Sequence, residues 1–128
     1  MLNTAVIGLG SNINPETNIR KARDILSKRF KILAQSQFIK TKPIGFSDQR
    51  DFINGVLLIE TDLNELRLKS ALKRIETSLG RTKDRHRYGP RTIDLDILVW
   101  NEKIVSQDFH TRNFIKKLVL AVVPNLNT

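Results

Sequence analysis

A chain of 128 residues is long enough to bury one hydrophobic core, so we expect a single domain over residues 1–128. The absence of cysteine excludes disulfides, thiol nucleophiles and zinc–thiolate sites, and no apolar run is long enough to span a membrane. Lys and Arg (22 residues) outnumber Asp and Glu (13 residues), and the formal net charge of +9 favours an anionic partner. The N-terminus lacks a basic leader, so we expect a soluble, cytoplasmic protein.

The spacing of apolar residues predicts an alternation of strands and helices. Short β-branched and apolar runs predict strands, whereas apolar residues three and four positions apart predict helices. In chain order the predicted elements are a strand over 2–9, a helix over 15–29, strands over 32–39 and 52–60, a helix between Asp62 and Gly80, and a strand over 93–100.

Capping residues mark the ends of both helices. Asn14 is the predicted N-cap of the first helix. Pro15 suits the first helical position, because an N–H there would have no hydrogen-bond acceptor within the helix and proline has no N–H. Asp62 is the predicted N-cap of the second helix, with Glu65 in the capping-box position, and Gly80 is its predicted stop.

Two glycines, Gly8 and Gly10, follow the first predicted strand. The segment lacks the Lys-Ser/Thr pair of a P-loop and the third glycine of a dinucleotide fingerprint. We interpret it as a turn that allows close packing.

The order of the elements predicts an α+β, ferredoxin-like βαββαβ fold. In this arrangement one antiparallel sheet has two helices on one face, and its other face is open and lined by loops. After residue 100 we expect a brief pairing at 104–105 and a last edge strand over 118–123.

Two carboxylates in the last predicted strand form a candidate metal site. Alternation places Asp94, Asp96, Leu98 and Trp100 on one face, and Ile93, Leu95, Ile97 and Val99 on the core face. Two residues of strand separate Asp94 and Asp96 by roughly 6.6 Å, so both could reach one divalent cation or a pair of them. The alternative is a solvated sheet face.

Basic residues lie directly before this strand. They are Arg81, Lys83, Arg85, Arg87 and Arg91. Oxygen ligands for a cation beside cations for an anion indicate a metal-bound polyphosphate, although arginines also commonly coat surfaces.

The long connection before residue 52 is a candidate binding loop. Phe52 and Asn54 share one face of the strand that follows it, and an Asn amide can pair with the amino-oxo edge of a pterin or purine. The alternatives are a surface excursion and a solvated asparagine. Glu76 lies in the last turn of the second helix, where an ordinary exposed glutamate is the alternative to a functional one.

Three segments together resemble the 6-hydroxymethyl-dihydropterin pyrophosphokinases. They are Arg-Tyr-Gly-Pro-Arg-Thr-Ile-Asp-Leu-Asp-Ile at 87–97, Gly-Leu-Gly-Ser-Asn at 8–12, and Thr-Lys-Pro-Ile-Gly at 41–45 followed by Gln49, Phe52 and Asn54. The resemblance extends from about residue 6 to residue 100. It implies transfer of a pyrophosphoryl group from ATP to a pterin alcohol in folate biosynthesis.

The resemblance also implies ligands and site residues. Asp94 and Asp96 would hold two Mg²⁺ ions, and Arg81, Lys83 and Arg91 would be the catalytic cations on the phosphates. The implied ATP-binding residues are Glu76, Lys83, Tyr88, Arg91, Ile97, His110 and Lys116. The implied pterin-binding residues are Thr41, Pro43, Ile44, Phe52, Asn54 and Leu118.

The chain departs from the family pattern after residue 100. The family has a Pro-His pair, then an arginine, then a second aromatic residue that closes over the pterin. Here His110 follows Phe109, and we align Lys116 with the arginine and Leu118 with the aromatic residue. The connection is also several residues short.

We therefore expect a monomer whose partners are ATP and the pterin, with no membrane partner. Two alternatives stay open. A basic ferredoxin-like domain can bind nucleic acid, although that function needs exposed aromatic residues on the central strands. The chain could also be an impaired relative that only binds its ligands.

Overall fold

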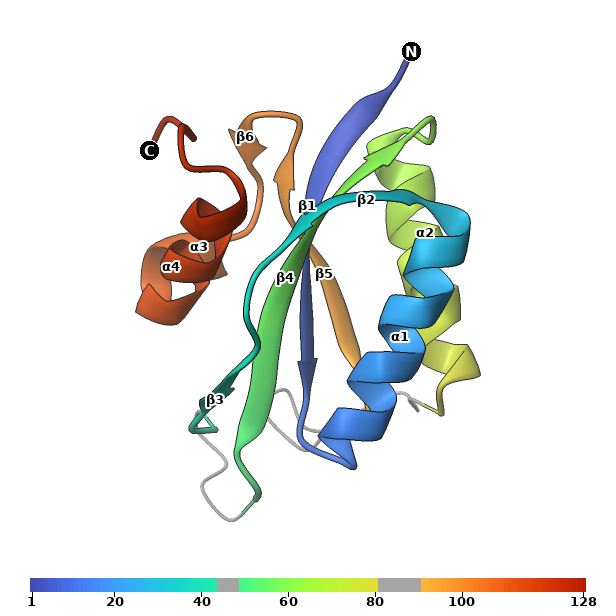
Figure 1. Cartoon of the computed structure of the whole chain (residues 1–128), viewed down its shortest axis with the longest axis vertical. Coiled ribbons are helices and arrows are strands. Elements are labelled where there is room, and N and C mark those ends of the chain that lie inside the picture. The colour runs from blue at the N-terminus through green and yellow to red at the C-terminus, as the bar shows by residue number, and fades with distance from the viewer. Residues whose placement is uncertain (44–48, 81–90) are drawn as a thin grey trace.

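The structure, a computed structural model, describes residues 1–43, 49–80 and 91–128. An antiparallel sheet runs through the molecule, with helices on both of its faces (Figure 1). Its strands are β1 (Asn3–Ser11), β2 (Lys31–Gln35), β3 (Ile39–Thr41), β4 (Phe52–Thr61), β5 (Asp94–Trp100) and β6 (Lys103–Ile104). The helices are α1 (Pro15–Arg29), α2 (Glu65–Ser78), α3 (Asp108–Thr111) and α4 (Asn113–Val122). The predicted α+β class and the βαββαβ order are confirmed.

Strand β1 lies at the centre of the sheet, which runs in the order β2, β4, β1, β5, β6. It pairs antiparallel with β4 on one side and with β5 on the other. The end of β1 therefore lies beside the beginnings of β4 and β5, and residues from three distant parts of the sequence meet there.

Helices α1 and α2 cover one face of the sheet and enclose the larger hydrophobic core (Figure 1). Ile7 and Leu9 of β1 are fully buried against Leu26 of α1 and Leu72 of α2. Helix α1 begins at Pro15 as predicted, although Asn14 has a left-handed backbone with φ 42° and makes no side-chain cap. No helix in the described part of the chain has the length and apolarity needed to cross a membrane.

Helix α4 covers part of the second face, and the edge strand predicted over 118–123 is wrong. Ile115, Leu118, Val119 and Val122 recur at helical spacing and are buried. They pack with Val6, Val56 and Leu98 in a second core. Four apolar residues three and four positions apart form one helical stripe, which outweighs the β-branched composition of the segment.

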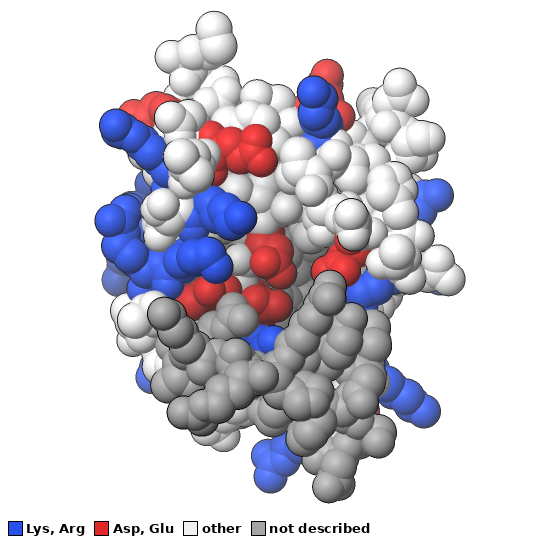
Figure 2. Space-filling view, turned by 180° about the vertical axis from the view of Figure 1, so that it is seen from behind, with Lys and Arg blue, Asp and Glu red and all other residues white. Residues whose placement is uncertain are grey.

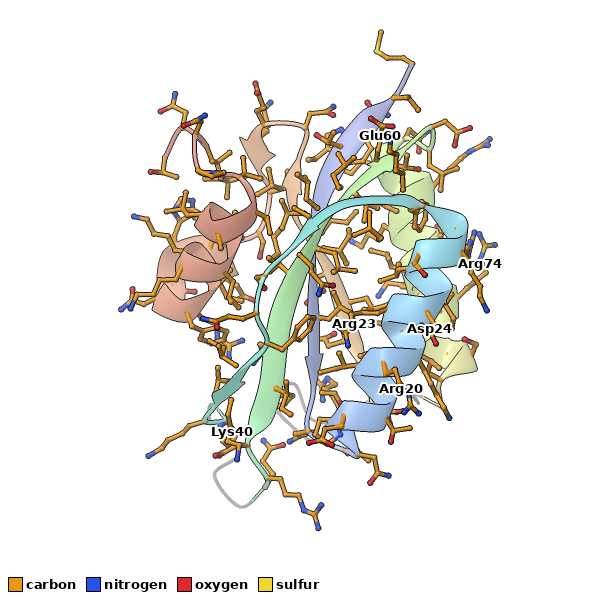
Figure 3. The ribbon with its side chains drawn as sticks, viewed as in Figure 1. Arg20, Arg23, Asp24, Lys40, Glu60 and Arg74 are labelled. Atoms are coloured by element: carbon orange, nitrogen blue, oxygen red, sulfur yellow. The ribbon has the colours of Figure 1, made fainter. Side chains whose placement is uncertain are left out.

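The second predicted strand is interrupted. Strand β2 ends at Gln35, and β3 begins at Ile39. Between them the Ser36 hydroxyl accepts a hydrogen bond from the Val56 N–H at 2.9 Å. Phe38 then covers Gly55 of β4, and the Arg23 guanidinium lies 5.1 Å from the centroid of the Phe38 ring (Figure 3).

Strand β5 keeps the predicted alternation only as far as Leu98. A β-bulge opposite Val6 and Ile7 places Leu98 and Val99 together on the α4 face, and Trp100 returns to the larger core. The predicted faces of Val99 and Trp100 are therefore wrong, because a bulge adds one residue to the strand and reverses the alternation beyond it.

The N-cap of α2 is Asn64. Its side chain accepts a hydrogen bond from the Arg67 N–H at 2.8 Å, which satisfies a free donor of the first turn. The predicted cap at Asp62 is thus two residues early, because the chain makes a further turn after β4. The predicted stop is confirmed, since Gly80 follows the helix with φ 97°.

Candidate active site

A cavity of about 110 Å³ lies on the second face of the sheet, next to the part of that face that α4 covers. Its walls come from β1, β4 and β5, from Arg91, and from the α3–α4 segment. Five of the residues named from the sequence line it: Phe52, Asn54, Arg91, Asp94 and Asp96. The structure thus brings the amide, the aromatic ring and the two carboxylates to one cavity.

The register of the sheet explains this gathering. Gly10 of β1 pairs with Asn54 on one side and with Asp94 on the other, and Gly8 pairs with Asp96. Residues opposite one another in a sheet project from the same face.

The two glycines form the floor of the cavity. A Cβ atom on Gly10 would lie 2.5 Å from Asn54 Oδ1, and one on Gly8 would lie 3.0 Å from Leu98 Cδ1. Our interpretation of Gly8 and Gly10 as a turn is wrong, because both lie within β1. Their absent side chains leave room above the backbone between the carboxylates and the amide.

Thr41 orients the Asn54 amide. Asn54 Nδ2 donates to Thr41 Oγ1 at 2.6 Å, across the pairing of β3 with β4. This bond directs Asn54 Oδ1 toward the glycine floor, where the oxygen can accept a hydrogen bond from a ligand.

Asp94 and Asp96 suit a metal that also binds a substrate. Asp94 is half-buried, Asp96 is exposed, and both line the cavity. No group of three or more His, Cys, Asp or Glu residues among those described could hold a metal ion. Two carboxylates fit Mg²⁺, which keeps several waters and completes its shell with substrate phosphates.

Glu76 lies behind the carboxylate pair and is only 6% exposed. Its Oε2 accepts a hydrogen bond from the Leu95 N–H at 2.7 Å, between Asp94 and Asp96. The alternative of an ordinary surface glutamate is therefore wrong. Glu76 joins α2 to the outer edge of β5 and helps to hold the strand that carries both aspartates.

Ser11 and Asn12, to which we gave no individual role, hold the segment that carries Arg91. Asn12 Oδ1 accepts a hydrogen bond from the Arg91 N–H at 2.8 Å, and Ser11 Oγ donates to the Thr92 carbonyl at 2.6 Å. Both polar side chains are buried. The sequence signal that could have found them was two small polar residues at the end of an apolar strand, because such residues need hydrogen-bond partners where the strand end is buried.

A second cavity, of about 280 Å³, lies along the outer edge of β5, between α2 and the start of α3. Ile97, Lys69 and Lys73 line it. Asp96 and Asp108 line both cavities, so the two adjoin. Figure 2 shows acidic side chains in the middle of one face of the molecule, with basic side chains gathered beside them.

The C-terminal residues are arranged differently from our alignment. Leu118 is buried in the second core, and Lys116 and His110 are exposed and line neither of the two cavities. Arg112 lines the first cavity, and its guanidinium lies 4.6 Å from the centroid of the Phe114 ring. Arg112 is thus an arginine that lines the first cavity, which the aligned Lys116 does not, and the aromatic Phe114 lies beside it.

The Nε–H of Arg112 is buried and, within the described residues, has no hydrogen-bond partner. A buried donor without a partner is costly, and a bound anion would relieve that cost. Our alignment with the family pattern put Lys116, and not Arg112, at the arginine position.

Other residues named from the sequence are not among the described lining residues. Arg81, Lys83, Arg85, Arg87, Tyr88 and Ile44 lie outside the described residues. Pro43 is described and half-buried, but it is not part of the lining of either cavity.

Comparison with known proteins agrees with the resemblance. A family model described as 7,8-dihydro-6-hydroxymethylpterin-pyrophosphokinase (HPPK) matches residues 6–124. The chain is 40% identical over 123 residues to the 2-amino-4-hydroxy-6-hydroxymethyldihydropteridine pyrophosphokinase of Haemophilus influenzae, across 88% of this chain and 76% of that protein. The same enzyme of Bacillus subtilis is 40% identical over 128 residues, across 94% of this chain and 76% of that protein.

A plant relative extends the comparison. The mitochondrial folate synthesis bifunctional protein of Pisum sativum is 37% identical over 127 residues, across 94% of this chain and 24% of that protein. With a family model that matches nearly its whole length, the chain belongs to the 7,8-dihydro-6-hydroxymethylpterin pyrophosphokinase family.

Proposed function

We propose that the chain transfers the pyrophosphoryl group of ATP to 6-hydroxymethyl-7,8-dihydropterin in the first cavity, where the reacting groups meet between β1, β4 and β5. Membership of the family establishes the reaction, pyrophosphate transfer to the pterin in folate biosynthesis, with ATP as the donor substrate. The observation that carries the location is that Asp94 and Asp96 line the same cavity as Phe52 and Asn54.

The pterin would bind on the β4 side of the cavity. Asn54 Oδ1, oriented by Thr41, would accept a hydrogen bond from the pterin amino group, and the Phe52 ring would cover the bicyclic ring. Because the floor is the backbone of Gly8 and Gly10, a flat ring can approach the sheet closely.

ATP would bind on the β5 side, with its base in the second cavity. Ile97 offers an apolar contact there, and Lys69 and Lys73 offer positive charge. Because Asp96 and Asp108 line both cavities, a nucleotide in the second would extend its phosphates past Asp96 into the first.

Asp94 and Asp96 would hold two Mg²⁺ ions on the triphosphate. When bound, the metal supplies charge neutralisation at the phosphate that is transferred. Arg91, and Arg112 in place of Lys116, would hold phosphate oxygens from the opposite side. The unpartnered Nε–H of Arg112 supports this choice.

The reaction then depends on how the two substrates are positioned and needs no protein nucleophile. The pterin hydroxymethyl oxygen forms a bond to the β-phosphorus, the bond from that phosphorus to the oxygen bridging the α-phosphorus breaks, and AMP leaves. The hydroxyl proton goes to solvent. Residues that align the attacking oxygen with this phosphorus supply most of the acceleration.

Release of AMP tests the proposal. The purified chain should release AMP from ATP only when the pterin and Mg²⁺ are both present. Asp96→Asn should abolish most of this activity, whereas Asp62→Asn, in the exposed turn before α2, should leave it unchanged. Binding of both ligands without AMP release would identify an impaired relative, and pterin-independent hydrolysis would contradict the proposed transfer.

A further inference from the structure

We propose that Asn12 is a positioning residue that joins the pterin-binding segment to the phosphate-binding segment, so that binding of one substrate strengthens binding of the other. The inference rests on the proposed function, because it assigns one substrate to each segment. It adds a residue that is not among the described lining residues of either cavity but is hydrogen-bonded to both segments.

Asn12 holds the phosphate-binding segment with two hydrogen bonds. Its backbone N–H donates to the Arg91 carbonyl at 3.1 Å, and its Oδ1 accepts from the Arg91 N–H at 2.8 Å. Both backbone groups of Arg91 are thus fixed by one residue. Asp94, three residues further on, begins β5 beside Gly10.

The same side chain holds the pterin-binding segment. Asn12 Nδ2 donates to Gln49 Oε1 at 2.6 Å and to the Arg50 carbonyl at 3.0 Å. Phe52 follows Arg50 by two residues and begins β4. One buried amide, 3% exposed, therefore spans the two chain segments that lead into the two sides of the cavity.

Only an amide of this length satisfies both sides at once. Asn offers two N–H donors and a carbonyl acceptor. Aspartate would keep the acceptor for Arg91 but would turn a carboxylate toward two oxygen atoms, those of Gln49 and Arg50. Alanine would leave buried partners unsatisfied on both sides.

Shared hydrogen bonds give a physical route for coupling. A shift of Arg91 toward a bound phosphate moves the partner of Asn12 Oδ1, and the amide is rigid, so its Nδ2 moves with respect to Gln49 and Arg50. A ligand that holds one segment in its binding geometry thereby spares the second ligand part of the cost of ordering the other segment.

Coupling can be measured as a ratio of affinities. The dissociation constant of the pterin is determined by calorimetry without nucleotide and with saturating α,β-methylene-ATP and Mg²⁺, an analogue whose α–β bridge cannot break. We expect the wild-type affinity to rise at least about fivefold with nucleotide. In Asn12→Ala the ratio should fall close to one, and kcat should fall more than KM rises for either substrate.

Asn3→Ala is the matched control. Asn3 lies at the other end of β1, where its Nδ2 donates to the Leu63 carbonyl at 2.9 Å, far along the strand from both segments. This variant loses that bond, the bond that Asn3 Oδ1 accepts from Asn101 Nδ2 at 3.2 Å, and some stability, but it should keep the wild-type ratio. A stability effect alone would therefore move both variants' melting temperatures and neither ratio.

A folded Asn12→Ala protein with the wild-type ratio would overturn the inference, as would a wild-type ratio of one. If Asn12→Ala does not fold, Gln49→Leu replaces it, because this change removes the Oε1 acceptor of Asn12 Nδ2 and leaves Asn12 itself in place; a smaller ratio supports the inference and an unchanged ratio overturns it. A wild-type protein that binds neither ligand would overturn the proposed function itself, before any variant is compared.

Discussion

Asp96 is the exposed member of the carboxylate pair, so its removal tests the metal site with little risk to the fold. Asp96→Ala should lower turnover by at least ~10²-fold, about 3 kcal/mol of transition-state stabilisation, because one of the two proposed metal ligands is lost. The measurement is kcat at saturating ATP, pterin and Mg²⁺, with circular dichroism to establish folding. Asp62→Ala, also at an exposed position but in the turn before α2, is the control. Near-normal turnover of folded Asp96→Ala would contradict the metal site.

Asn54 should discriminate between the two substrates. Asn54→Ala should weaken pterin binding by roughly 1–3 kcal/mol, because the amino-oxo edge of the ring loses its partner in a buried site. ATP affinity should change much less, since the amide lies on the β4 side of the cavity. Calorimetry with each ligand separately measures both effects. Equal weakening of the two would argue against the assignment.

The glycine floor leads to a separate prediction about pterin affinity. In Gly10→Ala the new methyl carbon would lie 2.5 Å from Asn54 Oδ1, so the amide must move away from its Thr41 bond. Pterin affinity should therefore fall by an amount similar to that in Asn54→Ala. The double variant should lose little more than either single one, because the two changes remove the same interaction. Additive losses in this cycle would show that Gly10 acts elsewhere.

At the residue scale, period-two alternation predicts which neighbours share a face. It correctly places Asp94 with Asp96 and Phe52 with Asn54. The role of Gly10 depends on which strands flank β1 and in what register, and no local pattern specifies this. Arg112 escaped prediction for a related reason, since its place depends on where the shortened connection ends.

The contact between α2 and β5 is the point where two elements determine the geometry of the site. Glu76→Ala should destabilise the fold by about 1–3 kcal/mol, because the Leu95 N–H would lose its acceptor inside the protein. Glu76→Gln keeps an acceptor of the same length and should lose less. Urea unfolding measures stability, and amide exchange at Leu95 locates the effect. Unchanged exchange at Leu95 in Glu76→Ala would show that another group holds this edge.

Elements with one buried face follow their apolar spacing, and for this reason both long helices and the central strands were predictable. The failures occur where a tertiary contact overrides local preference. The bulge in β5 reverses the faces of Val99 and Trp100, and Ser36 interrupts the second strand by using its hydroxyl as a backbone acceptor. Helix α4 was misread because Val119 and Val122 favour strands locally, but their spacing fits a helix that covers Val6 and Leu98.

At the scale of the whole molecule, α4 separates this fold from a sheet that binds nucleic acid. RNA-binding domains of this topology stack bases on exposed aromatic residues of the central strands. Here α4 packs over Val6 and Val56 of the two central strands, and Phe52 is the only aromatic residue that the described strands contribute to the cavity.

The net charge of +9 should act on ATP and not on the neutral pterin. From low to high salt, kcat/KM for ATP should fall by roughly threefold to tenfold, whereas kcat/KM for the pterin at saturating ATP should change little, because only the anion is attracted at long range.

Changing Lys69 and Lys73 to Gln removes two positive charges from the wall of the second cavity. Changing Lys21 and Lys28 to Gln removes the same charge from exposed positions on α1, a helix that lines neither cavity. The first pair should flatten the salt dependence for ATP much more than the second. Equal effects would show that ATP responds to the total charge and does not use the second cavity.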